Sequence, residues 1–295
     1  MTPVPSAKAP VLVLSSFVAR GSVGARAAFA LERLGHPVWT VPTILLPYHP
    51  GHTAKQGRGT RIVTPPESFA ALLADLARSS WLPDVGAIVS GYLGDPAQAS
   101  AVAEIVHAVK QANPNAFYLC DPVLGDGAGL YVPQPTAEAI RDQLIPLADI
   151  ATPNAFELGW LTGRAVTSPQ EAIAAARALG PTTVAVTSAP AMMRDAVATM
   201  LVSAEYAITA EHPAVQGAPN GPGDLFAALL TARRLQGLSD DAWLESAVAG
   251  TFDVIVRSVR AGCDEMNLTG EQDSLVRPMS SIHMRRVHSA SHPRR

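Results

Sequence analysis

Short apolar runs rich in valine and isoleucine alternate along the chain with longer alanine- and leucine-rich segments of helical period. This alternation is typical of a parallel sheet covered by helices. The pattern predicts strands over residues 11–17, 39–45, 85–92, 117–123, 150–152 and 183–187, and a further pair over residues 196–202 and 206–210. It predicts helices over residues 23–34, 68–78, 96–111, 135–144, 155–161, 169–179, 224–235 and 240–259.

Helix-boundary residues support this interpretation. Ser168, Pro169 and Glu171 are typical of a helix start, and Gly180 before Pro181 is typical of a helix end. Residues 47–59 are rich in proline, glycine and histidine, and we expect a mobile loop near a ligand there.

No internal repeat or long linker divides the chain. We therefore expect one α/β domain over residues 11–283, in which a mostly parallel central sheet forms a three-layer α/β/α arrangement. Residues 1–10 are expected to be flexible, and the basic residues 284–295 to form a disordered tail.

The composition excludes several classes of protein. With 22 Lys and Arg against 25 Asp and Glu in 295 residues, the net charge is −3. The chain therefore lacks the excess of positive charge that binds a nucleic-acid backbone. No apolar run approaches the ~20 residues of a membrane span, and the N-terminus lacks a secretory signal, so we expect a cytoplasmic protein without a membrane partner. Cys120 and Cys263 are too few for a disulfide framework. The expected partner is a small molecule.

Polar residues lie at or just beyond the ends of the predicted strands. Ser16, Tyr92, Asp121, Thr152 and Thr187 all occupy such positions. Ligands bind at the carboxyl ends of the strands in open parallel sheets, so we expect these residues to share one edge.

A glycine turn, Gly221-Pro222-Gly223, precedes Asp224 and an apolar helix. Glycines let the backbone approach a ligand closely, and the free N–H groups of a helix start attract a phosphate. Asp224 would then accept a proton from an attacking hydroxyl group. The alternative is that Asp224 is simply the N-cap of the helix.

Three acids are expected near the same edge, namely Asp121, Asp126 and Glu157. Magnesium with nucleotide phosphates would neutralise them, because Mg²⁺ prefers carboxylate oxygen and retained water. The alternative reading makes Asp126 a turn residue and Glu157 a solvated acid at a helix start. No Walker A motif is present, so a phosphate site here would have another design.

Several motifs occur together and in one order over residues 11–268. They are Ser16-Phe17-Val18 with Gly21-x-Val23-Gly24, Ser90-Gly91-Tyr92, Asp121-Pro122-Val123, Thr152-Pro153-Asn154-x-x-Glu157 and Gly221-Pro222-Gly223-Asp224. In this combination the chain resembles the pyridoxal kinases of the ribokinase-like superfamily.

The resemblance implies ATP-dependent phosphorylation of the 5′-hydroxymethyl group of pyridoxal, pyridoxine or pyridoxamine. It implies that Asp224 is the base, that the amides of Gly221 and Gly223 form the anion hole, and that Asp121 and Glu157 hold Mg²⁺ largely through water. It also implies a homodimer and leaves the need for a monovalent cation open.

The resemblance further assigns residues to each substrate. The vitamer site would be lined by Ser16, Pro50, Gly51, Tyr92 and Asp224. The ATP site would be lined by Asp121, Thr152, Glu157, Thr187, His212, Pro213, Ala214 and Val215.

Some positions depart from the family pattern. Pro222 stands where threonine or valine is common. It would remove one N–H donor from the anion hole, or it would simply favour the start of the helix. Pro50 replaces a threonine, and Phe17 replaces a histidine. Two alternatives therefore stay open: a hydroxymethylpyrimidine kinase, and a weakly active relative that binds B6 vitamers.

Overall fold

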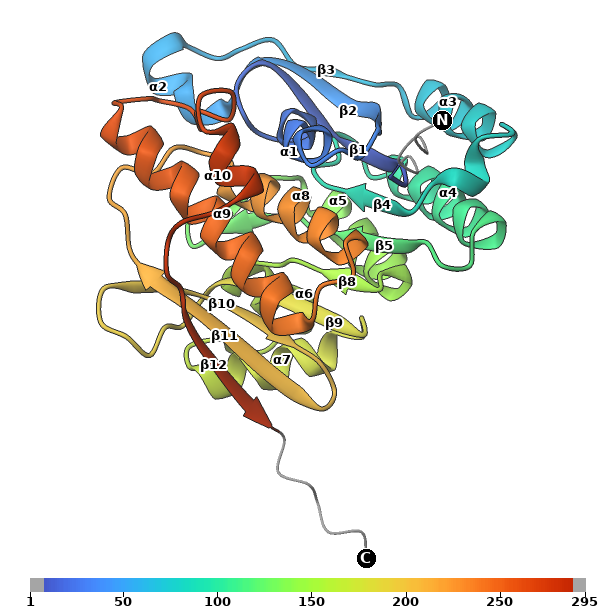
Figure 1. Ribbon diagram of the computed structural model, residues 1–295. Coiled ribbons are helices and arrows are strands. Elements are labelled where there is room, and N and C mark those ends of the chain that lie inside the picture. Colours follow the sequence, from blue (N-terminus) through green and yellow to red (C-terminus); the bar gives the residue numbers. More distant parts are fainter. Residues whose placement is uncertain (1–7, 289–295) are drawn as a thin grey trace, which may run out of the picture.

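The computed structural model describes residues 8–288, and one ten-stranded sheet extends through this part of the chain (Figure 1). Its strands are β1 (Val11–Arg20), β2 (Val38–Tyr48), β3 (Ile62–Val63), β4 (Ala87–Ser90), β5 (Phe117–Cys120), β8 (Ile150–Ala151), β9 (Thr183–Ala189), β10 (Ala196–Val202), β11 (Tyr206–Pro213) and β12 (His283–His288). The spatial order is β12-β11-β10-β9-β8-β5-β4-β1-β2-β3. The six strands from β9 to β2 in this order are parallel, and β3, β10, β11 and β12 add antiparallel edges.

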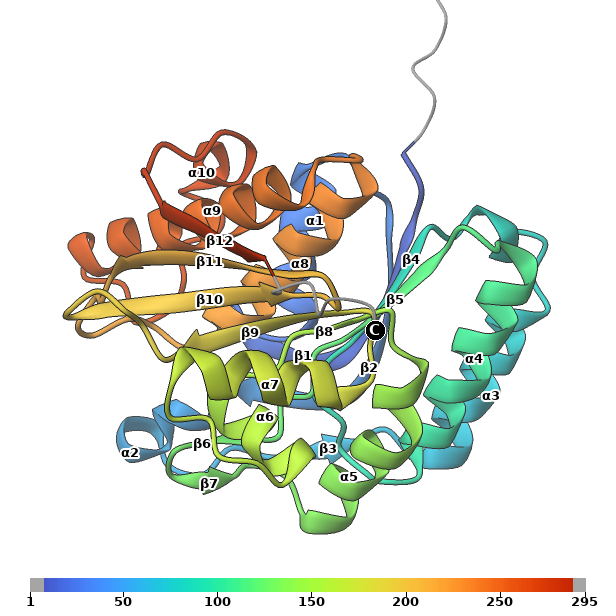
Figure 2. The same ribbon diagram turned by 90° about the horizontal axis from the view of Figure 1, so that it is seen from below.

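Helices cover both faces of the sheet (Figure 2). They are α1 (Phe29–Arg33), α2 (Thr53–Gln56), α3 (Pro66–Ala77), α4 (Gln98–Ala112), α5 (Gln134–Ala139), α6 (Ala155–Thr162), α7 (Pro169–Leu179), α8 (Pro222–Leu235), α9 (Asp240–Arg260) and α10 (Gln272–Val276). Helices α1, α8, α9 and α10 contribute to the core on one face, and α3, α4 and α5 to the core on the other. Helices α6 and α7 pack on β9, β10 and β11.

Strand β1 shows why the chain forms this layered arrangement. Val11 and Val13 pack into one core and Leu12 and Leu14 into the other, because successive side chains of a strand point to opposite faces. A strand that is apolar on both faces has to be covered on both. The predicted three-layer fold with a mostly parallel sheet is confirmed.

Capping residues set the helix boundaries. The side chain of Ser168 accepts the N–H of Glu171, the Glu171 side chain accepts the N–H of Ser168, and Gly180 ends α7 at a φ of 117°. The predicted helix over residues 169–179 is therefore confirmed with the same bounds.

The prediction of a disordered tail is wrong for residues 284–288. They belong to β12, which pairs antiparallel with β11 from Tyr206 to Glu211. The guanidinium of Arg286 lies 4.3 Å from the ring centre of Tyr206 and pairs with Asp241. The free main-chain groups of β11 can pair with almost any extended segment, so composition could not show this strand. Residues 289–295, and residues 1–7 of the predicted flexible N-terminus, lie outside the described part.

Two segments outside the predicted strands and helices contain regular structure. Within residues 47–59, a 3₁₀ turn over Pro50–His52 leads into the short helix α2. The glycine-rich segment after β5 forms a hairpin of β6 (Gly125–Asp126) and β7 (Gly129–Leu130). None of the helices in residues 8–288 combines the length and the apolar character that a membrane span requires.

Candidate active site

Residues just beyond the parallel strands continue the pairing of the sheet. The N–H of Asp121 donates to the carbonyl of Ser90 at 2.8 Å, and that of Thr152 to the carbonyl of Cys120 at 3.0 Å. Asn154 forms a parallel bridge with Thr187. Asp121, Thr152 and Thr187 therefore lie along one edge, as the sequence predicted.

Helix α8 begins at this edge with a glycine that no other residue could easily replace. Gly221 is the N-cap, with a φ of 93°, and an added Cβ would lie 2.5 Å from Cγ1 of Val23. Pro222 is the first helical residue, where a missing N–H breaks no helical hydrogen bond. In the first turn, the N–H groups without a helical acceptor are those of Gly223 and Asp224. A Cβ on Gly223 would meet nothing within 4 Å, so a ligand can approach that backbone.

Asp224 is the third residue of α8, and not its N-cap. Burial raises the pKa of its carboxyl group to about 6, although the N–H of Gly24 and its own N–H favour the charged form. Such a group is mostly ionised at pH 7 and is still basic enough to take a proton from an alcohol in the transition state.

Asp121 and Asp224 line the same small cavity of about 20 Å³, together with Ser15, Gly24 and Gly91. A cavity of that size holds about one water molecule. Asp121 is 8% exposed, and its Oδ1 accepts the hydroxyl of Thr152 at 2.9 Å. Burial, and then the charges of Asp224 and Glu157, hold the pKa of Asp121 well above its usual value.

Glu157 is an acid in the first turn of α6, where it forms a capping box with Asn154, but at 4% exposure it is buried and not solvated. Its Oε1 accepts the N–H of Leu124 at 2.7 Å and that of Gly125 at 3.3 Å, and its Oε2 accepts the N–H of Asn154 at 2.9 Å. Burial raises the pKa of Glu157, and these three N–H groups oppose the rise. The carboxylate thus joins the start of α6 to the loop that follows Asp121.

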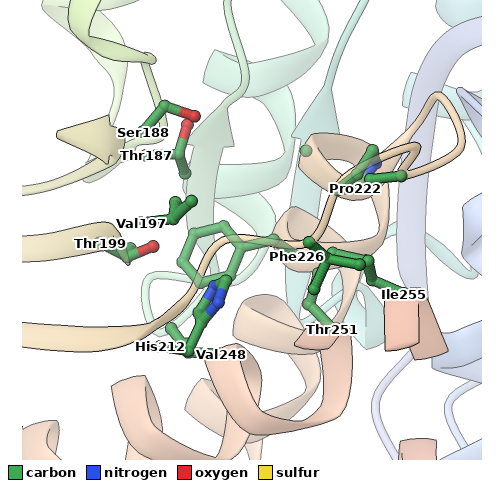
Figure 3. A pocket seen from close by; sticks show the side chains of 13 residues that line it. Thr187, Ser188, Val197, Thr199, His212, Pro222, Phe226, Val248, Thr251 and Ile255 are labelled. Atoms are coloured by element: carbon green, nitrogen blue, oxygen red, sulfur yellow. The ribbon is translucent and has the colours of Figure 1, made fainter. Parts of the chain in front are cut away.

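A pocket of about 240 Å³ opens beside the start of α8 (Figure 3). Thr187 and Ser188 lie at one side and Pro222 at the other, with Phe226 and His212 between them. Burial lowers the pKa of His212, which favours a neutral ring, and that ring lies 4.3 Å from the ring of Phe252.

The predicted ATP-site residues do not share one cavity. Asp121 lines the small cavity, and Thr152 and Glu157 line neither that cavity nor the larger pocket. Thr187, His212 and Val215 line this pocket, whereas Pro213 and Ala214 are exposed and outside its lining. Several residues that line the pocket were not expected from the sequence: Val197, Thr199, Phe226, Val248, Thr251 and Ile255. These residues belong to apolar strand and helix faces, and periodicity cannot distinguish a pocket wall from a core contact.

Apart from Asp224, the predicted vitamer-site residues line neither the larger pocket nor the small cavity. Ser16 is 6% exposed and so close to Gly24 that a Cβ on that glycine would lie 2.3 Å from its Oγ. Tyr92 packs against Ile44 and Leu46, and its hydroxyl accepts a hydrogen bond from Arg61 at 2.7 Å. Arg61 was not expected from the sequence.

Pro50 and Gly51 are exposed, and Gly51 lies against Asn220, immediately before the α8 glycine turn. The structure thus brings the loop of residues 47–59 to the same helix start as Asp224.

Asp121 and Glu157 fit a water-retaining magnesium ion better than a fully protein-ligated metal. Within residues 8–288, no group of three or more His, Cys, Asp or Glu side chains has the arrangement of a metal site. Both oxygens of Glu157 already accept N–H groups, so contact through water suits it. One or two carboxylates with several waters is the usual set for Mg²⁺ beside phosphates.

The fold and the site define a kinase of the ribokinase-like class that acts on a small molecule. The family model of phosphomethylpyrimidine kinase matches residues 64–269. Pyridoxal kinase PdxY of Deinococcus radiodurans is 36% identical over 94% of this chain and 96% of its own. That of Corynebacterium diphtheriae is 33% identical over 94% of this chain and 99% of its own.

A solved structure agrees with these relatives. The pyridoxal kinase of Leishmania donovani in complex with ADP and pyridoxine is 28% identical, with a TM-score of 0.85 over 94% of this chain and 98% of its own. The chain belongs to the pyridoxal kinase family, as its motifs predicted.

Replacing Asp224, the predicted base, tests this site. Asp224→Asn is expected to lower kcat by ~10²–10⁴, as the loss of a general base does. In the wild type, kcat/KM should fall as the pH drops through about 6, because protonated Asp224 cannot accept the proton. A variant with full activity would contradict the assignment.

The same variant should nevertheless be more stable than the wild type at pH 8. The folded-state pKa of about 6 lies above the ordinary value of ~3.9, so ionisation of Asp224 destabilises the fold as the pH rises through this range. The gain in melting temperature should vanish below about pH 4.

Proposed function

We propose that this protein transfers the γ-phosphoryl group of ATP to the 5′-hydroxymethyl oxygen of pyridoxal, pyridoxine or pyridoxamine, forming the 5′-phosphate. The observation that carries the proposal is the position of Asp224. The larger pocket ends at Pro222 and Gly223, directly before this buried carboxyl group, and the vitamer-side residues reach the same helix start.

The carboxyl group of Asp224 and the N–H groups at the start of α8 have separate roles in the reaction. Asp224 takes the proton of the 5′-hydroxyl group as its oxygen bonds to the γ-phosphorus atom. The bond from that phosphorus to the bridging oxygen breaks, and ADP leaves. The free N–H groups at the start of α8, with Gly221 shaping the turn, stabilise the charge on the moving phosphoryl group. Pro222 supplies no donor, so Gly223 carries more of this role.

A vitamer is favoured over a hydroxymethylpyrimidine as acceptor. The family model that covers residues 64–269 is described as phosphomethylpyrimidine kinase, but the relatives that match more than nine-tenths of the chain are pyridoxal kinases. The kinase of Leishmania donovani, which has the same fold, holds ADP with pyridoxine and, in another complex, pyridoxamine.

Magnesium is the metal that we assign to Asp121 and Glu157. The ion would neutralise negative charge on the nucleotide phosphates. Asp121 would hold the ion, and Glu157 would hold it through water. Thr152 orients Asp121 through its hydrogen bond, so the carboxylate needs no reorganisation when the nucleotide binds.

The protein is further proposed to act in the cytoplasm, where ATP is abundant, as a homodimer. Leu45 and Ile62 are 40% and 57% exposed and are directly paired on β2 and β3 at one edge of the sheet. Two such apolar side chains side by side suit contact with a second copy.

A substrate panel tests the function. Pyridoxal, pyridoxine, pyridoxamine and hydroxymethylpyrimidine are each supplied at saturating Mg·ATP, and ADP and the phosphate ester are measured. We expect kcat/KM for at least one B6 vitamer to exceed that for the pyrimidine by more than ~10-fold, that is, by over ~1.4 kcal/mol of transition-state binding. Preference for the pyrimidine would contradict the proposal, and binding of vitamers without turnover would favour a vitamer-binding protein.

The metal assignment is tested by titration. Asp121→Asn and Glu157→Gln should both raise the Mg²⁺ concentration needed for half-maximal rate, with the larger effect for Asp121→Asn because Glu157 acts through water. Asp142→Asn removes an exposed acid that pairs with Arg141, so its titration curve should match the wild type. An unchanged curve for Asp121→Asn would remove that residue from the metal site.

The oligomeric state is tested by light scattering after size exclusion. The wild type should elute at twice the mass of one 30.8 kDa chain. Ile62→Glu should shift it towards the monomer, whereas Met279→Glu, at an 80% exposed position far from β3 in the sequence, should not. A monomeric wild type would contradict the proposal.

A further inference from the structure

The loop of residues 47–60 has one buried side chain. All these residues are described, and among them His52 alone is buried, at 8% exposure. The other side-chain hydrogen bonds of the loop are local, such as the bond from Thr53 Oγ1 to the carbonyl of Pro50 at 2.6 Å. Segments with so few buried contacts open easily, so the contacts of His52 decide how firmly the loop is held.

His52 contacts a carboxylate from a distant part of the chain. Its Nε2 lies 2.6 Å from Oε1 of Glu265, and the two side chains are 10% and 14% exposed. Oε2 of Glu265 accepts both the N–H and the hydroxyl of Ser22, at 3.1 and 3.0 Å. An ionised carboxylate can only accept, so all three partners donate to it, and such charge-assisted bonds are the strong ones.

Ser22 connects Glu265 to the catalytic base. It lies in the turn after β1, two residues before Gly24, whose N–H hydrogen-bonds the carboxylate of Asp224. The hydroxyl of Ser22 also accepts the N–H of Met266 at 3.0 Å. Ser22 thus binds the turn that supports Asp224 both to the side chain of Glu265 and to the main chain of Met266.

The main chain of Glu265 makes a third connection. It forms a bridge with Asn220, the residue before the N-cap Gly221. A Cβ on Gly51 would lie 2.6 Å from Nδ2 of the same Asn220. Glu265 therefore contacts the loop, the β1 turn and the approach to α8.

We propose that Glu265 is a positioning residue that fastens the loop of residues 47–60, through His52, to the helix start that carries Asp224. The inference rests on the proposed function, because it treats this loop as one wall of the vitamer site. None of the residues that line the larger pocket belongs to the loop or to the β1 turn. Release of the loop should therefore weaken use of the vitamer and leave use of ATP unchanged.

Steady-state kinetics with both substrates test this difference. Glu265→Ala and His52→Ala should each raise KM for the vitamer roughly ten-fold or more, the factor expected for losing a hydrogen bond to a charged group. KM for ATP should change less than about two-fold. In the double variant the two effects should not multiply, because both substitutions break the same contact.

Asp264→Ala is the matched control. Asp264 is the preceding residue and pairs with Arg20 at 2.9 Å, but both side chains are more than half exposed, so little should depend on that pair. Its kinetic constants should stay near those of the wild type. Equal rises in both KM values, or multiplicative effects in the double variant, would overturn the proposal.

Limited proteolysis tests the fastening without any turnover. Lys55 and Arg58 are exposed trypsin sites within the loop. Cleavage there should be roughly ten-fold faster in Glu265→Ala than in the wild type and Asp264→Ala, since cleavage tracks the population of the open loop. If Glu265→Ala does not fold, His52→Ala makes the same test, because it removes the loop's partner in the same contact. An unchanged cleavage rate in a folded variant would refute the proposal that Glu265 fastens the loop. If the wild type phosphorylates no vitamer but Glu265→Ala is still cleaved faster, only the proposed function is refuted.

Discussion

Three carboxyl groups share one poorly solvated edge of the sheet, and the chemistry of the site depends on how their negative charge is balanced. Asp121, Glu157 and Asp224 all have raised pKa values, with burial as the first cause in each. No lysine, arginine or histidine of residues 8–288 forms an ion pair with any of them. Main-chain N–H groups and the hydroxyl of Thr152 supply the stabilisation instead. Because no side-chain cation balances this charge, the site is stabilised when a cation binds one carboxylate and when a proton binds another.

In the proposed function, the two substrates reach Asp224 from different parts of the fold. The larger pocket is built from β9, β10, β11, α8 and α9, whereas Ser16, Tyr92 and the loop of residues 47–60 come from the first third of the chain. These two parts of the chain meet at Gly221, where Val23 occupies the space that a side chain on the glycine would need. Glu265 reinforces the junction by contacting Ser22 and His52 with one carboxylate. If the proposed function holds, the binding of each substrate can therefore be altered separately from the other.

Local patterns were sufficient for the six parallel strands and most of the helices, and insufficient for contacts between distant segments. The strand at residues 196–202 and the helix at residues 169–179 were predicted with their observed bounds, because their apolar period and caps are local. β12 was missed because its partner is the free edge of β11, which exists only in the folded sheet. The contact of His52 with Glu265 joins residues 213 positions apart, and no spacing rule indicates it. Phe226 and Thr251 have the same periodicity as core residues, so their place in a pocket was not evident.

The geometry of the ternary complex tests the central claim most directly. A crystal structure with Mg²⁺, a non-hydrolysable ATP analogue and pyridoxal is expected to place a carboxylate oxygen of Asp224 within ~2.6–3.2 Å of the 5′-hydroxyl oxygen, in line with the γ-phosphorus. The N–H of Gly223 should point at the γ-phosphate oxygens. A complex in which Asp224 turns away from the hydroxyl, with no rotamer able to reach it, would contradict this account.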